Sequence, residues 1–143
     1  GDIFPSINLT FLFDYAFVDT SGRASIIRTL TSIRGQKLPL LYPQIFLELE
    51  VMADACENFS IGAAITAPSG KQVAKVQLNK RANTNAAGQV EESVLPLGFY
   101  NCKFEEAGEH HVEIFINDIA VHFLPLMIQV RNAGDAPDST HSV

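Results

Sequence analysis

Apolar and polar residues alternate with a period of two along most of this 143-residue chain, and no stretch sustains the 3.6-residue period of an amphipathic helix. Glycine and proline interrupt the alternation at roughly ten-residue intervals. The pattern predicts seven to eight strands in a two-sheet antiparallel sandwich of immunoglobulin-like architecture. A closed barrel is the alternative. We expect a single domain over residues 1–131 and a polar tail over residues 132–143.

The composition is that of a globular chain, with 47% hydrophobic and 18% charged residues. A domain of this size buries roughly 68% of its unfolded surface, which is enough for a core without metals or disulfides. No apolar run approaches the about 18 residues of a membrane-spanning helix. No signal peptide is visible, although Gly1 is compatible with removal of a leader. We therefore expect a cytoplasmic protein without a membrane span.

The charge is unevenly distributed. The formal net charge of −6 argues against nucleic acid as a partner. Up to Arg81 the chain has eight basic and seven acidic residues, a net of +1, whereas from Ala82 onward it has two basic and nine acidic residues, a net of −7. A solvated acidic surface is the favoured interpretation. A basic partner for the C-terminal half is the alternative.

Cys56 and Cys102 are the only cysteines. Cys56 lies in a polar stretch and Cys102 near an expected strand end. Nothing in their surroundings marks them as partners, so two free thiols are favoured over a disulfide.

The expected strands share alternating apolar residues between turn-forming residues. They cover residues 9–18, 24–34, 44–52, 59–67, 73–79, 90–102, 109–117 and 119–130. The inward side chains are expected to be Ile45, Leu47, Leu49 and Val51, then Ile61, Ala63 and Ile65, then Ala74, Val76 and Leu78, and finally Val112, Ile114 and Ile116. Both faces of the first strand are rich in apolar residues, which predicts cover on both sides.

Several segments depart from this regular pattern. Pro39 and Pro43 predict a crossover loop over residues 40–42. Pro96 and Gly98 predict an irregular edge strand. In the last strand, the apolar parity changes at residues 124–125, which predicts a bulge or a sheet switch there. Turns are expected at residues 19–23, with Gly22 in the left-handed conformation, and at residues 117–118.

Two segments resemble a bacterial family known only as a domain of unknown function. The first is the opening hairpin, in which an aromatic-rich strand containing Phe11 and Phe13 and ending near Asp14 is followed by a polar turn with Gly22 and a second strand. The second is the acidic turn and Gly-Glu pair of residues 104–114, before the last two strands. The resemblance implies an immunoglobulin-like sandwich and transfers no catalytic residue. His111 departs from it, where an aromatic residue is expected.

The histidines suggest one candidate metal site. His110 and His111 are adjacent, so on a strand they face opposite ways. Counting back from the turn at residues 117–118 pairs Glu113 with His122, with His111 one diagonal step away. Two histidines and a carboxylate could bind zinc. A polar surface patch is the favoured interpretation of His111, Glu113 and His122, so no metal site is assigned.

Other polar residues carry weaker signals. Asp14 lies on an apolar strand, where a buried carboxylate needs partners, so a structural role is favoured over a catalytic one. Lys80, Arg81, Asn83 and Asn85 lie in a polar loop over residues 80–88 that lacks the context of a phosphate cradle. The chain has no nucleophile elbow, paired Cys-x-x-Cys or His-Glu-x-x-His. No catalytic residue or cofactor is therefore assigned.

The leading functional hypothesis is a non-enzymatic module that binds another protein or a copy of itself. Sandwiches bind through end loops and edge strands. The candidate surfaces are the loop with Lys80, Arg81, Asn83 and Asn85, the edge over residues 94–99, and the segment with Leu41 and Tyr42. The alternatives are a small-molecule or metal-binding protein, including an enzyme, that uses the His/Glu cluster, and a structural subunit of a secreted or phage-like assembly.

Overall fold

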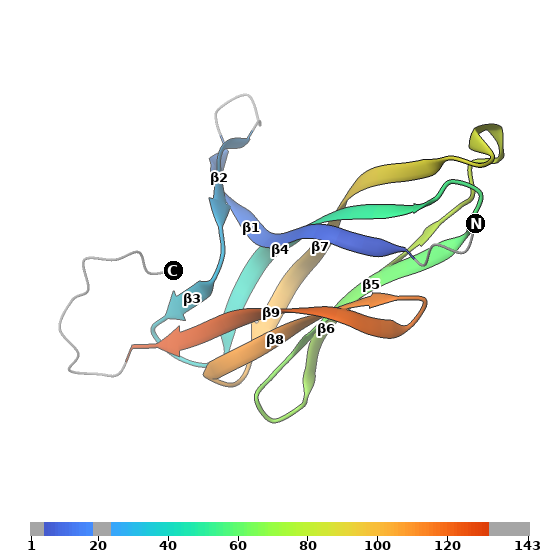
Figure 1. The fold of residues 1–143 in the computed structure, drawn as a ribbon. Helices are drawn as coiled ribbons and strands as arrows, with labels where there is room; N and C mark the ends of the chain where they lie inside the picture. Colours follow the sequence, from blue (N-terminus) through green and yellow to red (C-terminus); the bar gives the residue numbers. More distant parts are fainter. Residues whose placement is uncertain (1–4, 19–23, 132–143) are drawn as a thin grey trace.

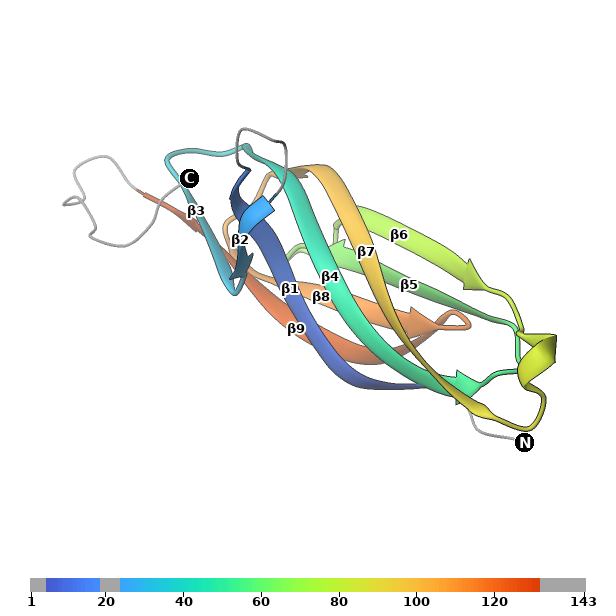
Figure 2. The ribbon, with the colours of Figure 1, turned by 90° about the horizontal axis from the view of Figure 1, so that it is seen from above.

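The computed structural model describes residues 5–18 and 24–131, and within these it describes the side chains except those of residues 15–18 and 24–28. Two sheets, ordered β2-β1-β4-β7 and β3-β9-β8-β5-β6, pack face to face (Figures 1 and 2). The elements are β1 (Ser6–Val18), β2 (Ala24–Thr29), β3 (Ser32–Gly35), β4 (Leu40–Asp54), β5 (Phe59–Thr66), β6 (Gln72–Lys80), the short 3-10 helix η1 (Thr84–Ala86), β7 (Val90–Phe104), β8 (Gly108–Ile116) and β9 (Ile119–Val130). The predicted turn at residues 19–23 and the predicted tail at residues 132–143 lie outside the described residues.

The predicted immunoglobulin-like two-sheet sandwich is confirmed, with one difference in its second strand. Residues 24–34 do not form one strand: β2 pairs with β1 in the first sheet, and β3 pairs in parallel with β9 in the second. The chain changes sheets over two residues. The amide of Leu30 donates to Leu12 O at 2.9 Å, and Thr31 O accepts from the amide of Met127 at 3.0 Å. Alternation predicts which side chains are buried, but not which sheet receives them.

The core lies between the two sheets and contains most of the predicted inward residues. The residues predicted inward on β4, β5 and β8 are all at most 1% exposed. Complete burial of a Leu, Ile or Val side chain contributes about 1.5–3 kcal/mol. The prediction is only partly right for β6, because this strand is at the edge of its sheet: Ala74 and Val76 are half-buried, and Leu78 is 40% exposed.

The predicted crossover loop at residues 40–42 is wrong, because these residues begin β4. β4 pairs with β7 in one continuous register, in which Tyr42 lies opposite Cys102 and Ile45 opposite Phe99. All four of these side chains are buried. Tyr42 and Ile45 are three residues apart, as are Phe99 and Cys102, and this spacing would put the two side chains on opposite faces of a regular strand. Both strands therefore change parity at the same level, where Asn101 has a φ of 55°.

The end of the pairing between β1 and β4 explains why a proline is accepted within β4. The pairing of β1 with β4 ends at Phe46, before Pro43 is reached, and a proline is tolerated where one edge of a strand has no ladder to donate to. The edge prediction for β7 is confirmed, but the strand is continuous through Pro96 and Gly98. Pro96 is acceptable because β7 is an edge strand.

The predicted change of parity at residues 124–125 is also wrong. The register of β8 with β9 passes through this point without a shift, and the irregularity lies between Ile114 and Phe115. The inward residues of β9 are Leu126 and Ile128, whereas Val121 and Phe123 are exposed by 39% and 61%. The apolar residues of β9 change parity in the sequence because Val121 and Phe123 are apolar residues at exposed positions. The predicted turn at Asn117 and Asp118 is confirmed, since their φ angles are 49° and 65°.

Asp14 is buried, and Tyr42 is one of its partners. The carboxylate is 5% exposed, and the hydroxyl of Tyr42, itself 4% exposed, donates a hydrogen bond to Asp14 Oδ2. The structural role expected for Asp14 is thus supported. The contact joins β1 to the part of β4 that lies beyond their last paired residues. It is made possible by the kink, which turns Tyr42 inward.

Replacing Tyr42 by Phe should therefore destabilise the fold without creating a cavity. We expect the free energy of unfolding to fall by about 1–3 kcal/mol, because a buried carboxylate loses a hydrogen bond. Urea denaturation measures the change. Tyr100→Phe is the matched control, since Tyr100 is 61% exposed, and it should change stability by less than about 0.5 kcal/mol. Equal unfolding midpoints for the wild type and Tyr42→Phe would contradict the assignment.

Candidate functional site

The three residues of the sequence-derived metal cluster do not come together as predicted. The register pairs Glu113 with Phe123 and Ile114 with His122, so His122 is one position away from its predicted partner. The cause is the irregularity after Ile114, which the count from the turn could not include. Instead, His111 Nε2 lies 3.8 Å from Glu109 Oε1. Among the described residues, no group of three or more His, Cys, Asp or Glu side chains is placed to hold a metal ion.

The prediction that His110 and His111 face opposite ways agrees with their positions. His110 is fully buried, its Nδ1 is 3.0 Å from the carbonyl oxygen of Gly108, and its ring meets that of Phe104 edge to face at 5.3 Å. Its Nε2 atom has no hydrogen-bond partner. His111 is exposed. His110 is therefore a core residue, packed where β7 and β8 meet.

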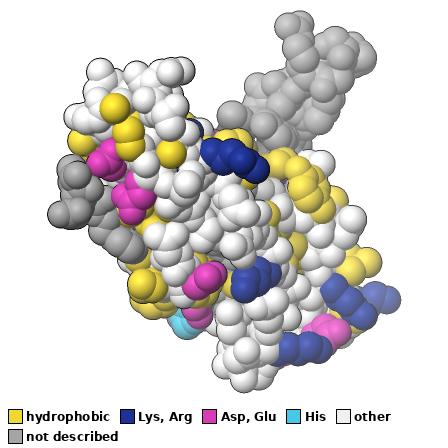
Figure 3. Space-filling model, turned by 90° about the vertical axis from the view of Figure 1, so that its right-hand side faces the viewer, with side chains coloured by type: hydrophobic (Ala, Val, Ile, Leu, Met, Phe, Trp, Pro, Cys, Tyr) yellow, Lys and Arg dark blue, Asp and Glu magenta, His cyan; other side chains and the backbone are white. Residues whose placement is uncertain are grey.

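The loop with Lys80, Arg81, Asn83 and Asn85 is held by hydrogen bonds within itself and to the segment between β4 and β5. Asn83 Oδ1 accepts from the amide of Asn85 at 3.2 Å and caps η1. Lys80 Nζ lies 3.8 Å from Glu91. Lys80 and Arg81, with Asn58, Phe59 and Asn79, line a wide depression of about 340 Å³. The side of the molecule seen in Figure 3 has both basic and acidic side chains, so this side as a whole does not favour one sign of ligand.

The segment with Leu41 and Tyr42 divides between surface and core. Leu41 is 67% exposed, as a docking residue would be. Tyr42 is buried against Asp14, so its prediction as a surface residue is wrong. The kink in β4 is again the reason, because it decides which of the two side chains points outward.

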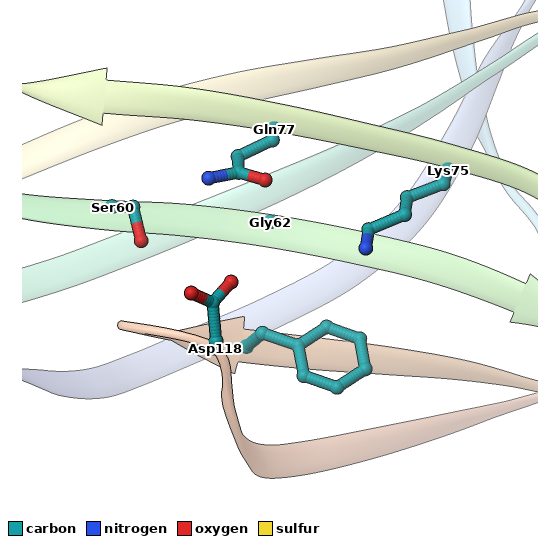
Figure 4. Close-up of a pocket in the computed structure, with 6 residues that line it drawn as sticks. Ser60, Gly62, Lys75, Gln77 and Asp118 are labelled. Carbon is teal, nitrogen blue, oxygen red and sulfur yellow. The ribbon is translucent and has the colours of Figure 1, made fainter.

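Two smaller hollows are lined by polar side chains. One, of about 100 Å³, lies over Gly62 and is surrounded by Ser60, Lys75, Gln77 and Asp118 (Figure 4), with Phe115 also in its wall. It is smaller than the roughly 300–1,000 Å³ of ligand pockets.

The second hollow, of about 170 Å³, contains Lys71, Lys103 and Glu105. Lys71 Nζ lies 2.7 Å from Glu105, which raises the pKa of the lysine and lowers that of the glutamate. Lys71 and Glu105 therefore neutralise each other as an ion pair.

The outer face of the four-stranded sheet has a different character, because it combines aromatic and acidic side chains. We call it the aromatic face. Its outward residues are Leu9, Phe11 and Phe13 of β1, Phe46, Glu48 and Glu50 of β4, and Glu92, Val94, Pro96 and Tyr100 of β7. The view in Figure 2 shows β1, β4 and β7 side by side in front of the second sheet.

Aromatic rings form a row across this face. The ring centroids of Phe11 and Phe13 are 5.8 Å apart, those of Phe13 and Phe46 are 5.3 Å apart and stacked, and Phe46 meets Tyr100 edge to face at 5.9 Å. Gly98 makes room for the last ring, since a β-carbon there would lie 2.8 Å from Tyr100 Oη. Such offset and edge contacts contribute about 0.5–1.5 kcal/mol each. Within the row Phe13 is only 4% exposed, and Phe11 and Phe46 are half-buried.

The ends and edges of the row remain open to solvent. Leu9 is 51% exposed, Val94 60% and Tyr100 61%. The prediction that both faces of the first strand are covered is therefore wrong at Leu9. The sequence pattern predicted the edge over residues 94–99 as a binding surface, but not the contributions of β1 and β4. Only the register shows that residues separated by more than 40 positions meet there.

Two carboxylates lie next to each other beside these apolar side chains. In the register, Glu50 is opposite Val94 and Met52 is opposite Glu92, so the two glutamates are diagonal neighbours on one face. A hydrogen bond that the protonated Glu50 carboxyl donates to Glu92, together with desolvation and the repulsion between the two charges, raises the pKa of Glu50. A like-charged pair of this kind favours the approach of a cation.

The chain belongs to a family of unknown function (DUF6941), whose model matches residues 8–129. The resemblance of the two terminal segments to such a family is thereby confirmed. A comparison with curated proteins gave no significant match. Among the described residues, no helix is long and apolar enough to cross a membrane.

Two solved structures are similar to this chain. One is an alkylpurine DNA glycosylase from Pseudomonas fluorescens, bound to DNA containing an abasic site analog, with 11% identity and a TM-score of 0.48 over 88% of this chain. The chain spans 30% of the length of that enzyme. The other is an immunoglobulin-like protein from Pseudomonas aeruginosa, with 12% identity, a TM-score of 0.39, and coverage of 89% of this chain and 98% of that protein.

The two cysteines allow a direct test of the core. Both are free; Cys56 is exposed, and burial raises the pKa of Cys102 to about 11. At pH 8 only about 0.1% of a thiol with that pKa is ionised, so we expect one thiol to react with a disulfide reagent in the folded protein and two after denaturation. No reactive thiol in either state would show a disulfide. Two in the folded state would contradict the burial of Cys102.

Proposed function

We propose that this chain is a non-enzymatic protein-binding module and that the aromatic face is its binding surface. The observation that carries the proposal is the grouping of Leu9, Val94 and Tyr100, all at least half exposed, around a row of stacked aromatic rings. Burying apolar surface contributes about 25 cal/mol per Å². Aromatic residues are also enriched among the side chains that dominate binding at interfaces.

The dimensions of the aromatic face support this role. Along β4 it extends from Gln44 to Met52, which is about 27 Å at about 3.3 Å per residue. Three strands about 4.8 Å apart make it about 14 Å wide, for an area of roughly 400 Å². This is the area of the whole face, including its glutamates. For comparison, the largest apolar patches on monomers cover roughly 300–600 Å² and are often functional.

The other predicted surfaces receive less support. The amide oxygen of Asn83 accepts from the backbone of its own loop, and that of Asn58, which precedes β5, accepts from the amide of Ala82 in the same loop at 2.6 Å. The exposed residues Val121 and Phe123 of β9 form a second apolar area, next to Glu113. It lacks the ring-to-ring contacts that organise the aromatic face. The free thiols of Cys56 and Cys102 fit a reducing compartment such as the cytoplasm.

A displayed library of random twelve-residue peptides tests the proposal. Peptides selected on the wild-type protein should lose at least about tenfold in affinity on the variant Val94→Ser/Tyr100→Ala, because truncating two interface anchors costs 1 kcal/mol or more each. Val121→Ser/Phe123→Ala, on the other sheet, is the matched control and should retain binding. Isothermal titration with the synthetic peptides gives the affinities.

Two results would count against the aromatic face. Peptides that bind the Val94→Ser/Tyr100→Ala variant as tightly as the wild type would place the binding surface elsewhere. Peptides lost only on the control variant would assign it to β9. Both variants must first show the circular dichroism and unfolding midpoint of a folded sandwich.

A further inference from the structure

We propose that the aromatic face binds a basic segment of a partner protein, in which Lys or Arg side chains lie next to apolar ones. The inference rests on the proposed function and adds the chemistry of the partner to it. Three observations carry it: the charge of the face, the placement of two of its carboxylates next to each other, and the separation of the Phe46 and Tyr100 rings from this acidic pair.

All the charged residues of the aromatic face have the same sign. Its outward positions include Glu48, Glu50 and Glu92, and none of the outward positions 9–13 of β1, 44–52 of β4 and 92–100 of β7 is Lys or Arg. By contrast, the exposed Glu105 has two cations nearby, Lys71 Nζ at 2.7 Å and Lys103 Nζ at 3.7 Å. Complementary charge steers association and excludes wrong partners. The face therefore selects against acidic partners and anionic surfaces.

Glu50 and Glu92 have an additional reason to prefer a cation. The register sets their side chains diagonally next to each other on one face, and two carboxylates so placed repel when both are ionised. A Lys or Arg placed between them would replace this repulsion with attraction. The gain is specific to a cation. A neutral apolar partner would leave the pair uncompensated beneath it, which carries a desolvation cost.

The rings of Phe46 and Tyr100 and the acidic pair occupy different ends of the face, whereas Leu9 and Val94 lie opposite Glu50 on its two sides. Phe46 and Tyr100 lie toward one end, and Glu50 and Glu92 toward the other. Phe46 and Glu50 are four residues apart on one strand, which is about 13 Å. A matching segment thus carries an apolar or aromatic residue and a basic residue separated by about 13 Å, a distance spanned by four residues of extended chain.

A second copy of this chain is a poorer occupant. A second copy packed through the same face would offer no Lys or Arg to Glu48, Glu50 and Glu92, so the acidic pair would stay uncompensated. The area of roughly 400 Å² is also half of the about 800 Å² that each partner buries in a stable protein pair. A short segment fits both the charge and the area.

Two synthetic peptides of twelve residues test the charge preference. One has a half of Tyr and Leu and a half of Lys, and the other has Glu in place of every Lys. Fluorescence anisotropy should show saturable binding of the Lys peptide alone, weakening as salt rises from 50 to 300 mM. The variant Glu50→Gln/Glu92→Gln should bind it about three- to tenfold more weakly, as loss of two exposed ion pairs implies.

The matched control is Glu109→Gln/Glu113→Gln, which removes two charges from β8 in the other sheet and should leave binding unchanged. Val94→Lys is a second test variant: Val94 is opposite Glu50 and 60% exposed, so the new ammonium should compete for the acidic pair and weaken binding at least threefold. Equal binding of the two peptides, or equal losses in the test and control variants, would overturn the inference.

The outcomes also separate this inference from the proposed function. Library peptides that depend on Val94 and Tyr100 but lack Lys and Arg would leave the aromatic face as a binding surface and overturn its preference for a basic segment. Sedimentation of the wild type as a dimer that Val94→Lys disrupts, without peptide binding, would assign the face to a second copy and overturn the inference as well.

Discussion

The pairing of β4 with β7 determines how the rest of the molecule is arranged. It keeps one register from Leu40 and Phe104 at one end to Asp54 and Val90 at the other. The two strands kink at the same level, so their inward side chains change parity together. The hydrogen-bonded pairing between the strands therefore continues on both sides of the kink. On one side the kink turns Tyr42 inward to the buried Asp14. On the other side the same ribbon carries the aromatic face.

The aromatic face combines two features that are unfavourable in an isolated protein. Apolar side chains such as Val94 and Tyr100 remain exposed, and Glu50 and Glu92 repel each other beside them. A sequence selected only for stability would relieve both. Local conflicts of this kind are expected at functional sites, where the missing stabilisation comes from a partner. One basic and apolar partner would relieve both conflicts at once.

Much of the core was predictable, and the failures share a cause. Alternation identified the inward residues of β4, β5 and β8, because a strand buried on one face leaves a period of two in its sequence. It failed at residues 24–34, where two strands enter different sheets, and at Pro43, where a proline lies within a strand. It also failed at His122, where an irregular register moved a side chain by one position. Each of these three features depends on how a strand pairs with a neighbouring strand, which its own alternation does not specify.

The candidate site shows the same division between sequence and tertiary structure. The sequence by itself determined a β-sandwich, its main inward residues, its family resemblance and an acidic C-terminal half. Only the tertiary structure brought Leu9, Phe46 and Tyr100 onto one surface and set Glu50 beside Glu92. The physical reason is that a strand's own periodicity specifies which side chains share a face, whereas the hydrogen-bonded register between strands specifies which of them become neighbours.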